Sequence, residues 1–168
     1  MRKLSSKGLK YLRYLHLLGV VLWIGGVLAL TVVLLFTHPT TPDGIYIRSY
    51  CVKLIDDILI IPGGIGLLVT GIVYGIWSKW GFFKHRWITV KWIITAFMVI
   101  LGAFALGNWV NANVYNMADM NDYITNQEEF KRNVTLTIFG GTVQLFCLLV
   151  VLWISIQKPW KRKEKCKT

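Results

Sequence analysis

Residues 14–36 read YLHLLGVVLWIGGVLALTVVLLF, a run of 23 residues in which only His16 carries a side chain that is charged or readily gains a proton near neutral pH. A helix needs about 20 apolar residues to cross the hydrocarbon core of a bilayer, so this run is long enough to span a membrane. Four of its positions recur at helical spacing and share one face: His16, Gly19, Trp23 and Gly26. An ionisable group inside a membrane is costly and marks a candidate functional site.

The composition of the whole chain agrees with a membrane protein. The 168 residues are 55% hydrophobic and 16% charged, and soluble domains contain about 25% charged residues. The net charge of +11 would fit nucleic-acid binding in a soluble protein, but here the basic residues lie at the ends of apolar runs. Topology and anionic lipid account for that distribution, so nucleic acid is not an expected partner.

Three further apolar runs follow the first one, at about 58–77, 87–110 and 134–156. The segment 37–53 contains two prolines and the segment 111–133 is polar, so both are expected to be loops. The sequence therefore predicts an all-α, polytopic membrane protein, a four-transmembrane-helix bundle that forms one membrane domain over residues 1–168.

Basic residues are distributed unevenly over the ends and loops of this bundle. The segment before residue 14 has five, the loop 78–86 has three and the tail after residue 157 has six, whereas the other two loops have two each. Lys and Arg accumulate on the cytoplasmic side of membrane proteins. The count predicts an N-in/C-in topology in the cytoplasmic membrane.

Two features of the second run concern helix packing and its outer end. Gly71 and Gly75 form a GxxxG step, the pattern of closely packed membrane helices. Asp56 and Asp57 precede the run and lie near basic residues. We expect them to form an ion-paired cluster at the outer interface, with a substrate entrance as the alternative.

The third run contains one charged residue, Lys91, four places after Trp87. In the predicted topology His16 and Lys91 both lie within roughly one to one and a half turns of the inner boundary, because a helix rises about 1.5 Å per residue. The two side chains could face each other inside the bundle. Alternatively, Lys91 extends its ammonium to the head groups and His16 is a hydrogen-bonded packing residue.

A family resemblance rests on these residues. The pattern His16, six residues, Trp23, one residue, Gly25-Gly26 resembles the first helix of the CopD copper-resistance membrane proteins. It is also similar to the start of the HemJ-type protoporphyrinogen oxidases, in which a later helix carries a lysine in a context like Trp87-x-x-x-Lys91. The resemblance covers most of the chain in layout and about six residues in detail.

The resemblance implies haem b inside the bundle and a redox or tetrapyrrole-related role, with an oxidoreductase of the protoporphyrinogen-oxidase kind as the implied enzyme. By that analogy His16 is a haem ligand and Lys91 a propionate or substrate partner. A haem also needs a flat space beside small residues and cations for its propionates. The surface of Gly25 and Gly26 beside Trp23, and the cation of Arg13, could supply these.

The second axial ligand stays open at this stage. His16 and His38 are 22 residues apart, roughly 30 Å in a continuous helix, so one haem cannot take both. His85 is the other histidine on the predicted cytoplasmic side. The remaining arrangements are His16 alone, His16 with Lys91, and His16 with His85.

Two alternatives from other classes remain. One is a CopD-like copper or small-solute transport module, although the methionines are scattered and form no copper motif. The other is a non-catalytic membrane partner subunit in which His16 only packs. A homo-oligomer or a membrane redox partner is compatible with each of these hypotheses.

Overall fold

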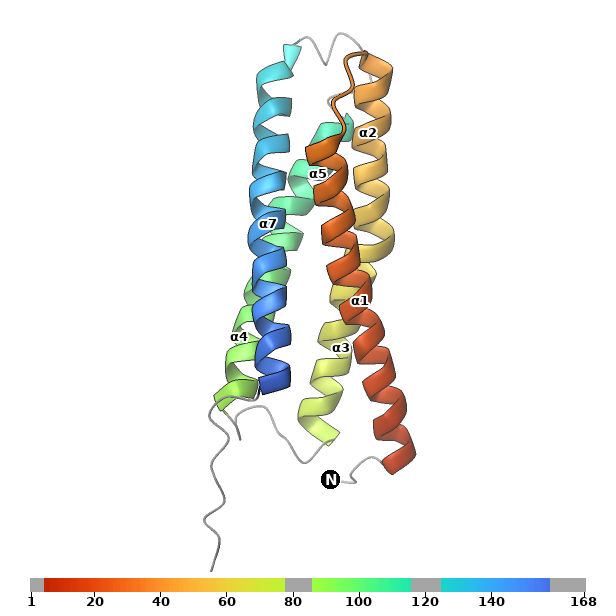
Figure 1. The fold of residues 1–168 in the computed structure, drawn as a ribbon, viewed down its shortest axis with the longest axis vertical. Coiled ribbons are helices and arrows are strands. Elements are labelled where there is room, and N and C mark those ends of the chain that lie inside the picture. Colours follow the sequence, from red (N-terminus) through yellow and green to blue (C-terminus); the bar gives the residue numbers. More distant parts are fainter. Residues whose placement is uncertain (1–4, 78–85, 116–124, 158–168) are drawn as a thin grey trace, which may run out of the picture.

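The computed structural model describes residues 5–77, 86–115 and 125–157. These residues form four long helical rods that run alternately up and down in one bundle (Figure 1). Each rod is long and apolar enough to cross a membrane, which agrees with the predicted four-helix architecture. The rods comprise α1 (Ser6–Phe36); α2 (Pro42–Ile55), the π-helical η1 (Asp56–Ile60) and α3 (Ile61–Trp77); α4 (Arg86–Leu101), the π-helical η2 (Gly102–Leu106) and α5 (Gly107–Tyr115); and α7 (Gln127–Gln157).

The helices extend further than the apolar runs, and the loop expected over residues 37–53 is confined to residues 37–41. α2 begins at Pro42, whose ring suits the first helical position, and the Thr41 side chain accepts a hydrogen bond from the Gly44 backbone N–H. The expected loop 111–133 is likewise helical up to Tyr115 and again from Gln127. Hydropathy marks only the part of a helix that lies in hydrocarbon, whereas polar residues beyond it can continue the helix in water.

α1 and α3 pack with their backbones in close approach. A Cβ atom added to Gly63 would lie 2.7 Å from the Trp23 backbone nitrogen and 3.1 Å from the Gly19 carbonyl oxygen. One added to Gly26 would lie 2.9 Å from the Leu59 Cβ. Glycine is therefore required at this crossing, because any side chain would push the two helices apart.

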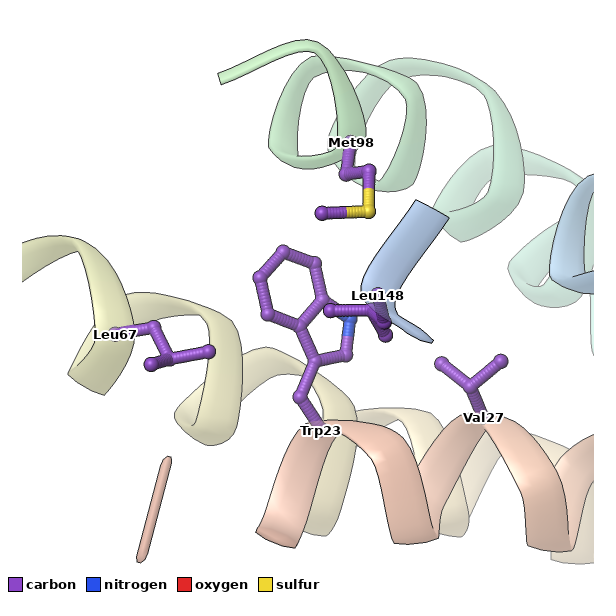
Figure 2. Close-up of a cluster of buried hydrophobic side chains, with 5 residues drawn as sticks. All are labelled: Trp23, Val27, Leu67, Met98 and Leu148. Atoms are coloured by element: carbon purple, nitrogen blue, oxygen red, sulfur yellow. The ribbon is translucent and has the colours of Figure 1, made fainter. Parts of the chain in front are cut away.

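The largest buried cluster joins all four rods around Trp23. Figure 2 shows the indole projecting from α1 toward Met98 of α4, with Leu67 of α3 and Leu148 of α7 on either side. Trp23 is 2% exposed and Met98 is fully buried. A second cluster, toward the upper end in Figure 1, contains Leu30, Leu34, Val52 and Val110.

α1 begins and α7 ends at the same end of the bundle, the lower end in Figure 1. Four crossings of the membrane therefore put the start of α1 and the end of α7 on the same side, as the predicted N-in/C-in topology requires. That this side is the cytoplasm stays a prediction from the basic residues.

Candidate functional site

His16 lies between α1 and α3, where its hydrogen bond determines which ring nitrogen carries the proton. Its Nδ1 is 2.8 Å from the Thr70 hydroxyl oxygen, and that oxygen is 2.6 Å from the Gly66 carbonyl oxygen. A hydroxyl has one proton, which Thr70 donates to Gly66, so it accepts from His16. The neutral imidazole therefore holds its proton on Nδ1 and keeps a lone pair on Nε2, the arrangement found in metal-binding histidines.

Two further groups surround this histidine. The Tyr74 ring meets the imidazole edge to face, with the ring centroids 5.8 Å apart. The Lys91 ammonium lies 5.8 Å from the centroid of the Trp87 ring, a cation–π distance, and its charge also acts on His16. No hydrogen bond joins His16 to Lys91 in the part of the chain that the structure describes, so that the two side chains face each other stays a prediction.

The remaining residues expected around a haem are distributed over different surfaces. Arg13 is exposed one turn before His16, and Gly25 is exposed with no neighbouring atom near its face. Gly26 is closed by Leu59 and Ile60, so the flat space expected beside it is wrong. Trp23 belongs to the central core. His85 lies outside the described residues.

A cavity of about 350 Å³ lies higher in the bundle, between all four rods. Functional ligand pockets measure about 300–1,000 Å³, so it has the size of a small-molecule site. His16 is not among its lining residues. Its lining includes residues from each of the four rods, among them Trp23, Asp56, Gly64, Met98, Gly102 and Gln144.

Polar groups project into this cavity from three helical rods. The Trp23 Nε1–H is buried and has no hydrogen-bond partner among the described residues. Gln144 is 1% exposed and donates to the Met98 carbonyl oxygen over 3.4 Å, a long hydrogen bond. Asp56 is 8% exposed, and its carboxylate has no hydrogen-bond or ion-pair partner within residues 5–77, 86–115 and 125–157.

The adjacent acid behaves differently, so the expected ion-paired cluster is only half formed. Asp57 lies 2.9 Å from the Lys53 ammonium, which also donates to Asn111 across 2.7 Å. Arg48 instead donates to the Thr37 carbonyl oxygen. Asp57 is therefore paired, while Asp56 is turned toward the cavity.

Both π-helical segments border the cavity. η1 begins at Asp56, and η2 begins at Gly102, which faces Gln144. An extra residue in a helical turn redirects the side chains that follow, and such turns occur frequently at functional sites. Asp56 and Gly102, the first residues of the two segments, line the same space from different rods.

The cavity is also open to one side. Its lining residues Ile61 and Ile65 are 45% and 57% exposed, and Ala103 opposite them on η2 is exposed as well. α3 and α4 do not pack along their lengths, although Trp92 reaches toward Gly71 near the lower end. In a bilayer this opening would face the acyl chains.

Sequence reasoning found His16 and Lys91 but missed the cavity. The signals present were the acidic pair before the second apolar run and the buried polar stripe of Thr137 and Gln144. Neither shows where a helix changes its pitch, so the convergence of Asp56 with Gln144 could not be predicted. Within the described residues no group of three or more metal-ligating side chains comes together.

Comparison with known proteins adds a family. Residues 10–159 match the family model described as a predicted integral membrane protein (DUF2269). No curated protein and no solved structure matches the chain.

Proposed function

The chain belongs to this family of predicted integral membrane proteins, and on that premise we propose that it binds a small molecule in the cavity between η1 and η2. This is the step on which a small-solute transport module depends. The carrying observation is the polar lining of that cavity. Among the described residues the Trp23 Nε1–H is buried without a hydrogen-bond partner, and Asp56, 8% exposed, lines the same space outside the Lys53–Asp57 ion pair.

The free energies involved support a ligand. A buried donor without an acceptor costs about 1–3 kcal/mol, and an unpaired buried charge costs more. A bound molecule that accepts from Trp23 and interacts with Asp56 would remove both costs. The cavity volume of about 350 Å³ is that of roughly twelve water molecules in the liquid, enough for a small organic solute.

The experiment compares two nearby glycines of α3. A Cβ added to Gly64 would make ordinary contact with the Trp23 ring at 3.8 Å, and the rest of a leucine there would fill the cavity. Gly66 has open space at the same position and does not line the cavity, so Gly66→Leu is the matched control.

Native mass spectrometry of protein extracted from its own membrane should detect a bound small molecule in the wild type and in Gly66→Leu. The same molecule should be absent from Gly64→Leu, with the fold of each variant checked by circular dichroism. Its absence from the wild type, or its retention in a folded Gly64→Leu protein, contradicts the proposal.

Haem b, with a redox or tetrapyrrole-related role, is a second candidate, and the proton position on His16 favours it. Nε2 keeps a free lone pair, and Thr70 holds the ring as a metal-bound histidine is held. His16 would be the axial ligand, with Lys91 or Arg13 as the cation for a propionate. The described cavity does not reach His16, so the residues supply a ligand but not that space.

The visible spectrum of the detergent-purified protein tests this candidate. Haem at His16 predicts a Soret band that His16→Ala abolishes, that Thr70→Val shifts or weakens, and that His38→Ala leaves intact. His38 is exposed at the opposite end of α1 and is therefore the matched control. A colourless protein after expression with added haem rules out haem binding.

A further inference from the structure

Acidic side chains outnumber basic ones at the polar end of the cavity, and this excess indicates the class of ligand. Lys53, Asp56 and Asp57 lie within two turns and together contain two acids and one base. The Lys53 ammonium is bonded to Asp57 and to Asn111, and no ion pair among the described residues includes Asp56. One negative charge is therefore left at the cavity, on Asp56.

The cavity is also long and changes character along its length. It is lined from Met98 on α4 to Asn111 on α5, a separation of roughly 20 Å along a helix that rises about 1.5 Å per residue. Asn111 and Asp56 line its outer end, where the second apolar run of the sequence begins. Met98 and Val99 line the inner end.

The cavity also opens sideways, between α3 and η2. Ile61, Ile65 and Ala103 place an apolar gap between α3 and η2, at the level where acyl chains lie. A molecule with a hydrocarbon body could enter through this gap with its polar end toward the membrane surface. A two-chain lipid is far larger than about 350 Å³, whereas a single short chain is not.

We infer that the cavity binds a single-chain organic cation, an amine whose ammonium group pairs with Asp56, whose chain has an oxygen that accepts from the Trp23 Nε1–H, and whose hydrocarbon body lies against Met98. The inference rests on the proposed function and adds the chemical class of the ligand. Asp56 supplies the counter-charge, and the polar side chains of Asn111 and Gln144 line the same space.

The test uses two probes with the same hydrocarbon chain and different head groups: n-octylamine, which is cationic at neutral pH, and n-octanol, which is neutral. Each is titrated calorimetrically into the full chain in phosphatidylcholine nanodiscs, and the heat of empty nanodiscs is subtracted. Asp56→Asn removes the charge at nearly constant shape. Glu128→Gln is the control, because it removes an exposed charge that is paired with Lys131 and does not line the cavity.

The wild type should bind n-octylamine at least tenfold more tightly than n-octanol. Asp56→Asn should remove that preference, and Glu128→Gln should change it by less than threefold. Equal binding of the two probes by the wild type, or equal losses in the two variants, overturns the inference. If neither probe binds while a small molecule still co-purifies with the wild type and not with Gly64→Leu, the cationic class is wrong and the proposed function stands.

Discussion

The bundle contains two helix–helix boundaries that use small residues in opposite ways. Between α1 and α3, Gly19 and Gly63 allow the backbones to approach until no side chain fits. On the side of α4 and η2, Gly64 and Gly102 line a space that stays open. Gly63 and Gly64 are adjacent in the sequence, yet one is closed by backbone and the other faces a cavity.

The difference shows that a glycine in a membrane helix has no fixed meaning. In lipid, helices associate through close packing and hydrogen bonds, because hydrocarbon tails are as apolar as the side chains. The α1–α3 boundary has both, since the His16–Thr70 hydrogen bond lies next to the glycine crossing. The boundary around the cavity has π-helical turns and unpaired polar groups instead. We interpret the first boundary as the stable support and the second as the binding surface.

The largest effect is expected from Gly63→Ala. The added methyl group would lie 2.7 Å from the Trp23 backbone nitrogen, and backbone cannot move aside as a flexible side chain can. We expect the free energy of unfolding to fall by about 2–3 kcal/mol, the usual cost of overpacking. Unfolding in detergent–SDS mixtures measures it, and an unchanged value would mean that α1 and α3 are not in backbone contact.

The next effect concerns the hydrogen bond of the same boundary. Thr70→Val keeps the shape and removes the acceptor of the His16 Nδ1–H. The free energy of unfolding should decrease by about 1 kcal/mol, as for other hydrogen bonds between membrane helices. Thr142→Val is the control, because that exposed hydroxyl bonds only to Ile138 of its own helix among the described residues. Equal losses in both variants would argue against the interhelical bond.

Gly64→Ala should have the opposite sign from Gly63→Ala. Its methyl group would be 3.8 Å from the Trp23 ring, an ordinary contact, and alanine costs less backbone entropy in a helix than glycine. The free energy of unfolding should rise by about 0.5–1 kcal/mol. Destabilisation comparable to that of Gly63→Ala would show that the two boundaries do not differ.

The smallest effect is expected at the outer rim of the cavity. Asp57→Asn breaks the salt bridge to Lys53, which is partly exposed to water. Such pairs contribute about 0.2–1 kcal/mol, so the melting temperature should change little in low salt and not at all in high salt. A large, salt-independent loss would mean that Asp57 is buried in the membrane-embedded protein and that the charge assignment at Asp56 needs revision.

Most of the architecture could be predicted from the sequence, and so could the choice of His16 and Lys91 as candidate residues. Four apolar runs predicted four rods, and the spacing of His16, Gly19, Trp23 and Gly26 predicted the face that α1 turns toward its neighbours. The GxxxG step of Gly71 and Gly75 was a weaker guide, because the structure makes its tightest crossing at Gly63 and sets Gly71 against the Trp92 side chain. The spacing of a GxxxG motif shows which face of a helix has small side chains. Which glycine lies at the closest approach depends on where the neighbouring helix crosses that face.

The cavity could not be predicted, for two physical reasons. A π-helical turn rotates every later residue around the helix, so a regular periodicity misjudges which residues of α3 share a face with Asp56 and which residues of α5 share a face with Gly102. Whether an acid is paired also depends on its neighbours in three dimensions. Asp56 and Asp57 are indistinguishable in the sequence, yet one is bonded to Lys53 and the other lines the cavity.

The central claim is tested most directly by a crystal structure of the protein, purified from its own membrane and crystallised in a lipid mesophase. We expect α1 and α3 in backbone contact, the space between η1 and η2 open, and electron density for a small molecule between Asp56 and Trp23. A structure in which α3 and α4 close together, Asp56 pairs with Lys53 and no space remains beside Trp23 would contradict the account.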